Sequence, residues 1–364
     1  MRTHMRSATC RLSLLVLVAL LAAAAARGDA WEARAPIPHH VYGQSAAVLN
    51  GRLHVLGGCH TSNWQVPCGF HQVFDPAADA WSLAPELPLA VAWGMPAVHK
   101  GKIYLFGGGV HRPQQGITST ERAWVFDPAA NRWSPIRDLP VPIMNGFAVA
   151  AGDFIYVGLG YHREGGRGRD IRAHHRNTYR YDPARDLYER VADAPEEGCY
   201  AAAGVWNVCV YVVHGAELEI GFEGRQEYQW ADGALKYDPA ADRWTKIDAP
   251  RMKKRVFYLT QCTSSGVFGS KLFAVGGMGE QRERTSVAEY FDMARESFHE
   301  LPPIPRARCC GSCGVVDGHL ILTGGFWGTD SVADRARETW LLHVGALDTA
   351  ADAAGRPHAH DPNP

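Results

Sequence analysis

The sequence predicts an all-β fold, a β-propeller of six four-stranded blades, on three observations. A double glycine closes an alternating apolar run about every fifty residues, a turn sequence such as Phe-Asp-Pro follows the run, and one large aromatic residue then opens another short strand. A repeat of this length, built from short strands and glycine turns, is typical of radial repetition around an axis. The joint recurrence of the three features therefore predicts the fold class.

The glycine-ended runs mark the second strand of each repeat. They read RLHVLGG (52–58), KIYLFGG (102–108), DFIYVGLG (153–160), VCVYVVHG (208–215), KLFAVGG (271–277) and HLILTGG (319–325). Glycine tolerates positive φ, so the chain can turn away at this point without a Cβ clash. The Asp-Pro after the third strand predicts a turn, because proline presets φ and aspartate can hydrogen-bond forward.

One large aromatic residue opens the outer strand of each repeat. These residues are Trp31, Trp81, Trp133, Tyr188, Trp244 and Phe298. A buried tryptophan contributes about 150–250 Å² of contact, so we expect them to pack between adjacent blades. Runs of small residues, such as QSAAV (44–48) and AAAGV (201–205), suit an innermost strand, where the blades crowd around the axis.

The order of double glycine, Tyr-Asp-Pro or Phe-Asp-Pro, and tryptophan is similar to the Kelch repeat over about residues 31–344. The chain departs from that pattern at residues 158–160, at His214-Gly215, and at Tyr188 and Phe298, which replace tryptophan. The resemblance implies a Kelch-type propeller, and it implies binding more often than catalysis.

The two ends of the domain are expected to meet in one blade. After residues 339–344 the chain has no aromatic residue and no strand pattern, so the sixth blade lacks its own outer strand. We expect residues 30–34 to complete this last blade, next to Trp31. The propeller is therefore assigned to residues 30–344, and residues 345–364 are expected to be a disordered tail.

Residues 1–26 have the pattern of a secretory signal peptide, with three arginines, an apolar stretch and a small-residue cleavage region. Cleavage after Ala26 or Ala30 would change the net charge from −1 to −4. We therefore expect a secreted protein, extracellular or lumenal, that is a monomer. The charge argues against nucleic acid as a partner. The apolar stretch of residues 12–26 is short for a bilayer span, so no membrane insertion is expected.

An even number of cysteines remains after cleavage: Cys59, Cys68, Cys199, Cys209, Cys262, Cys309, Cys310 and Cys313. Such a count in an exported chain permits disulfides. Cys59 and Cys68 flank one loop, and we expect a disulfide between them. The cluster at 309–313 could suggest a metal, but zinc needs four tetrahedral ligands, whereas neighbours on a strand point to opposite faces. We expect no metal and no cofactor.

The ligand-binding face is expected where the loops between the second and third strands meet the interblade segments. His60, His111 and His162 each lie two residues past the glycines of their repeat, and Trp327 has this register in the sixth. We add Tyr42, Trp93, Lys253, Arg255, Arg306 and Arg308, whose cations suit carboxylates or sulfates. The three histidines could instead be solvated rim residues or hold a metal, although neighbouring blades are too far apart for ~2.0–2.1 Å bonds to one ion.

Two segments exceed the usual loop length, and long loops are often functional. Residues 161–177 are rich in arginine, whereas residues 214–233 are rich in acidic residues. Either these opposite charges attract each other between neighbouring blades, or they form a polar groove for a partner.

The favoured function is a secreted binding module that holds an extracellular protein or glycan, with no catalytic residue assigned. The alternative is an exported sugar mutarotase or epimerase, because signal peptide, length and six-bladed ring resemble the bacterial sialic-acid mutarotase. That resemblance implies acid–base roles for Glu217 and Arg225. A third class, the Kelch-containing copper radical oxidases, needs two histidines, two tyrosines and a cross-linked cysteine around copper, a set that we do not identify.

Overall fold

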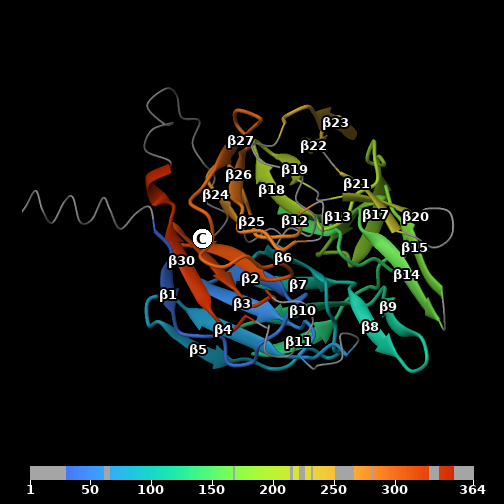
Figure 1. Cartoon of the computed structure of the whole chain (residues 1–364). Coiled ribbons are helices and arrows are strands. Elements are labelled where there is room, and N and C mark those ends of the chain that lie inside the picture. Colours follow the sequence, from blue (N-terminus) through green and yellow to red (C-terminus); the bar gives the residue numbers. More distant parts are fainter. Residues whose placement is uncertain are drawn as a thin grey trace, which may run out of the picture.

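Six antiparallel sheets of four strands stand around a common axis in the computed structural model of the chain (Figure 1). The structure describes residues 30–60, 66–166, 169–213, 216–220, 226–230, 233–250, 266–279, 283–327 and 336–347. For residues 165–166, 169–172, 216–220 and 226–230 only the backbone is described. The predicted six-bladed propeller is therefore confirmed.

The first three blades follow one another along the chain. Blade one consists of β2 (Ser45–Leu49), β3 (Arg52–Leu56), β4 (His71–Asp75) and β5 (Ala80–Leu83). Blade two consists of β6 (Met95–His99), β7 (Lys102–Phe106), β10 (Ala123–Asp127) and β11 (Arg132–Pro135). Blade three consists of β12 (Phe147–Ala151), β13 (Phe154–Gly158), β16 (Thr178–Asp182) and β17 (Leu187–Val191).

The last three blades have the same order of strands, from the axis outward. Blade four consists of β18 (Ala202–Trp206), β19 (Cys209–Val213), β22 (Ala234–Asp238) and β23 (Arg243–Ile247). Blade five consists of β24 (Val267–Phe268), β25 (Lys271–Val275), β26 (Ala288–Asp292) and β27 (Ser297–Glu300). Blade six consists of β28 (Ser312–Val316), β29 (His319–Thr323), β30 (Thr339–His343) and β1 (Glu32–Arg34).

Strand β1 comes from the other end of the chain and closes the ring. It pairs antiparallel with β30, with Ala33 opposite Trp340, and the two strands lie side by side in Figure 1. The indole Nε1 of Trp31 donates a hydrogen bond to the carbonyl oxygen of Pro302 in blade five, at 3.0 Å. This confirms the prediction that residues at the N-terminal end complete the last blade. After β30 the chain continues into a short 3-10 helix, Gly345–Leu347, within the predicted tail.

Three further hairpins extend from the loops that join second and third strands: β8 (Gly109–Arg112) with β9 (Gly116–Ser119), β14 (Tyr161–Gly166) with β15 (Arg169–His174), and β20 (Ala216–Ile220) with β21 (Gln226–Trp230). Strand β9 lies beside β14, and β15 beside β20. Ser119 joins the first two hairpins, because its hydroxyl donates to the carbonyl of Tyr161 and accepts from the N–H of Arg163. The segments at 161–177 and 214–233, which the sequence suggests are loops, thus carry hairpins.

Apolar side chains fill the space between neighbouring blades. Between blades one and two, for example, Leu49 and Leu56 pack with Ile103, Leu105 and Trp133 in one buried cluster. No helix in the described part of the chain is both long and apolar enough to cross a membrane.

The outer-strand aromatic residues also tie five of the six blades to the preceding blade by hydrogen bonds. Each bond runs from the aromatic N–H or O–H to the main-chain carbonyl four residues after the aromatic residue of the preceding blade. These aromatic interblade bonds join Trp81 to Ala35 (2.8 Å), Trp133 to Pro85 (3.2 Å), Tyr188 to Arg137 (3.0 Å), Trp244 to Ala192 (3.0 Å) and Trp31 to Pro302 (3.0 Å). The ring is therefore closed by directed bonds as well as by packing.

We predict that Tyr188→Phe lowers the free energy of unfolding by ~1 kcal/mol, the usual net contribution of one hydrogen bond. The ring remains and only the Oη–Arg137 bond is lost. Urea denaturation measures the change. The exposed neighbour Leu187, replaced by threonine, is the control, and we expect its effect to stay within 0.5 kcal/mol. Equal stability of Tyr188→Phe and the wild type would show that the bond contributes nothing.

Candidate functional site

A ring of main-chain hydrogen bonds surrounds the axis on the loop-bearing face, where each inner strand begins. The N–H of Gly43 donates to Cys310 O (2.7 Å), Trp93 N–H to Gly43 O (2.6 Å), Asn145 N–H to Trp93 O (3.1 Å) and Tyr200 N–H to Asn145 O (2.7 Å). We call these five residues the axial ring. Each belongs to a different blade, and the corresponding segment of blade five lies outside the described residues.

All five members of the axial ring have a left-handed backbone. Their φ angles are 64° for Gly43, 55° for Trp93, 58° for Asn145, 57° for Tyr200 and 55° for Cys310. Only glycine adopts this region at little cost, and a bulky residue there is uncommon. At Gly43 a Cβ would lie 2.5 Å from the Trp93 ring, so glycine is required there and the indole packs directly on it. The ring thus fixes four non-glycine side chains around the axis.

Aromatic and sulfur-containing side chains pack around the axial ring, and we call this part of the loop-bearing face the mouth. Tyr42 contacts Trp93 (ring centroids 6.2 Å apart) and Phe326 (5.6 Å), and Tyr161 contacts Tyr200 (6.2 Å). Trp93 and the half-buried Met278 pack against both groups. The amide of Asn145 donates to the hydroxyl of Tyr161 at 2.9 Å, in a buried position. The mouth is therefore a filled surface built from all six blades.

A cluster of imidazoles lies on the blade-one side of this mouth. His39 stacks on Phe70, with ring centroids 4.1 Å apart and an interplanar angle of 14°. Its main-chain N–H donates to the side-chain carbonyl oxygen of Gln72. His60 lies edge-on to Phe70 at 5.3 Å and 4.9 Å from the ring of His40. The rings face one another as an aromatic patch. Among the described residues there is no group of three His, Cys, Asp or Glu side chains placed to bind a metal.

The three histidines that share one register do not meet. His60 belongs to the imidazole cluster, His111 is exposed on β8, and His162 interacts with Glu164 at 3.3 Å. Their equivalent positions put them on separate blades. His60 lies beside three other aromatic rings, those of His39, His40 and Phe70.

Arg306 and Trp327 form the cationic part of the mouth on blade six. The guanidinium of Arg306 lies over the Trp327 ring at 3.3 Å and also pairs with Glu338 at 3.6 Å. Nearby, the guanidinium of Arg284 lies 4.6 Å above the ring of Phe326. A cation held over an aromatic face gains from the ring quadrupole and keeps its N–H donors for other groups. This pair presents positive charge beside apolar surface.

Arg308 was expected on the ligand-binding face, and the structure corrects this expectation. Its side chain is fully buried and donates to the carbonyls of Gly324 and Glu338 and to the Glu338 carboxylate. Burial lowers the pKa of Arg308 to about 10. The guanidinium therefore ties blade six internally and is not available to a ligand.

Four predicted residues cannot be placed through their side chains. Lys253, Arg255 and Arg225 lie outside the described residues, and Glu217 is described only through the backbone of β20. Cys262 also lies outside this part of the chain.

The expected disulfide between Cys59 and Cys68 is absent from the structure. Neither cysteine is disulfide-bonded, and the Cys68 thiol instead donates to the carbonyl of Gly58 at 3.1 Å. Burial raises the pKa of Cys68 to about 11, so the thiol stays protonated at neutral pH. The bridges that join Cys59 to Tyr42 and to Pro67 already fix this loop by main-chain pairing. Cys313 in β28 is disulfide-bonded.

Five residues that build the mouth were not predicted from the sequence: Asn145, Tyr200, Tyr161, Phe326 and Met278. One signal was available. The members of the axial ring come just before the small-residue inner strands, and three of them, Trp93, Asn145 and Cys310, directly precede a glycine.

Comparisons with known proteins agree with this geometry. The Kelch motif, as a protein family, matches residues 96–140 and 260–305. The chain is 28% identical to Kelch-like protein 25 of Xenopus tropicalis over 60% of its length, and 22% identical to Kelch-like protein terF of Aspergillus terreus over 77%. It spans 34% and 60% of those relatives, respectively. Over 42% of its length the chain is 27% identical to human Kelch repeat and BTB domain-containing protein 12.

Among solved structures, the one titled "Structure of YjhT" has a TM-score of 0.65 and 13% sequence identity. The match covers 86% of this chain and 97% of that one, so the likeness concerns the whole ring, and it shows the fold alone.

The sheets, the closure and the interblade bonds define the chain as a six-bladed β-propeller whose loop-bearing face is built around the axial ring. With the repeated glycine and aromatic sequences and the matches above, it is a Kelch-repeat propeller.

Proposed function

We propose that the chain is an exported interaction module that holds an extracellular protein or glycan on the mouth around the axial ring. The observation that carries the proposal is the left-handed backbone of Trp93, Asn145, Tyr200 and Cys310. Such conformations cost about 1–3 kcal/mol each and cluster in proteins at binding sites, where the surrounding structure enforces them. The main-chain bonds of the axial ring hold these four side chains in fixed positions around the axis, and such a preorganised surface supports a role in binding.

The chemistry of the mouth favours a partner with an anionic group next to an apolar or sugar-ring surface. Arg306 is exposed, lies over Trp327 and retains donors that suit a carboxylate or sulfate. Trp93 and Met278 are half-buried, and the stacked pair His39–Phe70 adds a flat surface. Aromatic surface with a few charged groups is typical of interaction sites that bury apolar area and fix orientation by polar contacts.

The test is partner capture with a charge-reversed variant. Immobilised wild-type protein is exposed to an extracellular protein fraction and to an array of sulfated and carboxylated glycans. We expect Arg306→Glu to retain at least ~10-fold less of the captured partner, equivalent to ~1.4 kcal/mol. Arg185→Glu is the matched control, because Arg185 is exposed in the turn between β16 and β17, at the opposite end of the strands.

Two outcomes would contradict this proposal. One is the absence of any partner for the wild type in both the protein and the glycan experiments. The other is equal binding by the Arg306→Glu and Arg185→Glu variants, which would show that the charge at the mouth has no part in recognition.

A second candidate function is that of a sugar mutarotase acting on a sialic-acid-like sugar. What supports it is the place of Glu217, whose strand β20 extends from the same face as the mouth. Mutarotation of one pure anomer of sialic acid, followed by NMR, tests it. We expect no acceleration over the buffer rate if the chain is only a binding module. Acceleration that Glu217→Gln abolishes would establish the enzyme instead.

A further inference from the structure

The seam between blades four and five lacks the aromatic interblade bond found at the other five seams. The residue in the donor position is Phe298, which is 4% exposed and packs on Phe291 with ring centroids 4.9 Å apart, but a phenyl ring has no N–H or O–H. The carbonyl it would reach is that of Asp248, four residues after Trp244. Within the described residues Asp248 makes no main-chain hydrogen bond through its N–H or its carbonyl.

A second interblade bond is also replaced at this seam. At three other seams an aspartate lies two residues before the aromatic donor. Its carboxylate accepts a hydrogen bond from the main-chain N–H of the same residue whose carbonyl accepts the aromatic interblade bond. These aspartate bonds join Asp79 to Ala35 (3.0 Å), Asp186 to Arg137 (2.8 Å) and Asp242 to Ala192 (2.8 Å). Blade five has Glu296 in this position, and its carboxylate accepts from Lys236 Nζ at 3.0 Å and from Tyr211 Oη at 3.4 Å. The main-chain N–H of Asp248 therefore has no carboxylate acceptor of the kind found at those three seams.

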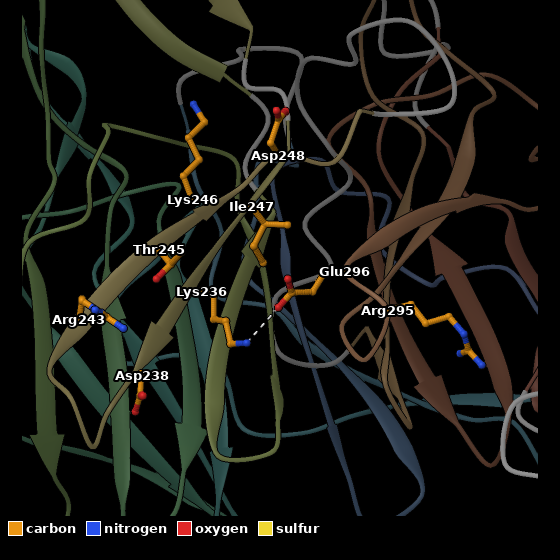
Figure 2. Close-up of a pocket in the computed structure, with 9 residues that line it drawn as sticks. All are labelled: Lys236, Asp238, Arg243, Thr245, Lys246, Ile247, Asp248, Arg295 and Glu296. Atoms are coloured by element: carbon orange, nitrogen blue, oxygen red, sulfur yellow. Dashed lines mark hydrogen bonds and ion pairs between the residues drawn. The ribbon is translucent and has the colours of Figure 1, made fainter. Parts of the chain in front are cut away.

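An open cleft of about 610 Å³ lies at this seam (Figure 2). Its blade-four wall is built by the β22–β23 pair, where Lys236 lies opposite Thr245 and Asp238 opposite Arg243. The consecutive residues 245–248 also line it, and because successive strand residues point to opposite faces, the cleft extends around the edge of β23. The other wall is the turn of blade five that carries Arg295 and Glu296. Strand β23 is the outermost strand of its blade, so one of its edges has no neighbouring strand in the sheet.

Most charged groups that line the cleft have an ion-pair or hydrogen-bond partner among the described residues, and two have none. Glu296 pairs with Lys236, Lys246 pairs with Glu196, and Asp292 holds Arg295 at 2.7 Å. Asp238 accepts from the N–H groups of its own turn. Arg243 and Asp248 are exposed and form no ion pair with the described residues. Arg243 begins β23 and Asp248 follows its last residue, so the two charges stand at opposite ends of this strand (Figure 2).

We propose that this cleft is a second binding site, which holds an extended peptide segment of a partner protein along the open edge of β23. A peptide bond offers one acceptor and one donor, the two groups that the N–H and carbonyl of Asp248 lack at this seam. Main-chain pairing at an open edge gives affinity, and side-chain pockets give specificity. An acidic side chain of the peptide would face Arg243 and a basic one would face Asp248. The site is separate from the mouth around the axial ring.

Selection from phage-displayed random octapeptides tests the proposal. The library is passed first over the double variant Glu296→Asp/Phe298→Trp, which restores the residues of the other seams, and is then selected on the wild type. We expect enriched peptides that carry both an acidic and a basic residue. The double variant should melt roughly 2–4 °C higher, because it adds two interblade hydrogen bonds at this seam, and it should not bind these peptides. If the variant closes the cleft, it should gain stability and lose binding. A misfolded variant would lose both.

Two single arginine variants test the proposal independently if the double variant does not fold. Arg243→Glu should weaken binding of an enriched, fluorescein-labelled peptide at least ~10-fold by anisotropy. Arg132→Glu should leave it unchanged, because Arg132 is the exposed residue before Trp133 in the equivalent strand β11 of blade two. The proposal is overturned if no peptide is enriched on the wild type, if Arg243→Glu binds as the wild type does, or if N-acetylglucosamine, which also carries an amide, displaces the peptide.

Discussion

A chain that begins at Ala35 will be less stable than one that begins at Ala30 by about 5 kcal/mol, a large part of the 5–15 kcal/mol typical of a folded domain. The five residues removed contain β1, which pairs with β30 from Glu32 to Arg34, and Trp31, whose indole bonds to Pro302 in blade five. Without them β30 becomes an unpaired edge and the seam between blades five and six loses its aromatic wedge. Truncating a buried tryptophan alone typically costs ~3–5 kcal/mol.

Two point variants divide this loss into its parts. Trp31→Ala should cost ~3 kcal/mol, toward the low end of the range because the ring is only partly buried, whereas Trp31→Phe should cost ~1 kcal/mol by removing the N–H donor. Glu32→Gln, which breaks only the exposed pair with Arg34, is the control and should stay within 0.5 kcal/mol. Urea denaturation of the four chains measures all of these. An unchanged midpoint for the chain that begins at Ala35 would mean that the ring does not depend on β1.

The sequence predicted the fold because its scaffold residues repeat. The glycine-ended runs, the Asp-Pro turns and the outer aromatic residues each recur in register, so every copy supports the others, and the missing outer strand of blade six could be inferred by subtraction. The same repetition also shows that blade five lacks the aromatic donor present in the other blades. Phe298 was recognised as a departure, but the consequence for Asp248 needed the interblade bonds, which join residues about fifty positions apart.

The candidate site was less predictable because residue type does not reveal burial. Arg308 belonged on the mouth by charge and register, yet it bonds to carbonyls inside blade six. Tyr42, Trp93 and Arg306 lie on the loop-bearing face, because register decides which loops share that face. The axial ring was missed because a left-handed φ at Trp93, Tyr200 or Cys310 is imposed by the ring of main-chain bonds and not by the residue.

A pair of buried histidines between blades one and two makes the fold sensitive to acid. The Nδ1 of His54 and the Nε2 of His71 lie 2.8 Å apart in adjacent strands, and the ring of His71 packs edge-on to Phe126 at 4.8 Å. Burial, with a smaller contribution from the charge of Arg52, lowers the pKa of His54 to about 4. Burial, followed by the charge of His54, lowers the pKa of His71 to about 3. Both rings are therefore neutral in the folded protein at pH values where an unfolded chain is already protonated.

The sign of the effect follows from which state binds more protons. Above pH 6.5 both histidines are neutral in the folded and the unfolded state, so the pair does not make the free energy of unfolding depend on pH. Below pH 6.5 the unfolded chain takes up two protons that the folded protein excludes, so stability falls as the pH falls, until His54 and then His71 protonate within the fold near pH 4 and pH 3. With 1.36 kcal/mol per unit for each site, the loss at pH 5 is roughly 4 kcal/mol.

The double variant His54→Phe/His71→Ala should remove this loss while preserving the packing of the seam. Blade five has Phe273 and Ala288 at the same register, opposite Tyr290 and Val275, so the chain itself shows that this pair of residues fits a blade. Urea denaturation at pH 7.5 and pH 5 gives the difference in unfolding free energy for the variant and the wild type, and carboxylates that titrate in this range contribute equally to both. We expect the wild type to lose roughly 4 kcal/mol more than the variant. Equal losses in the two proteins would mean that the imidazoles are hydrated in the folded state, and that blades one and two are less tightly packed than Phe126 and Trp133 indicate.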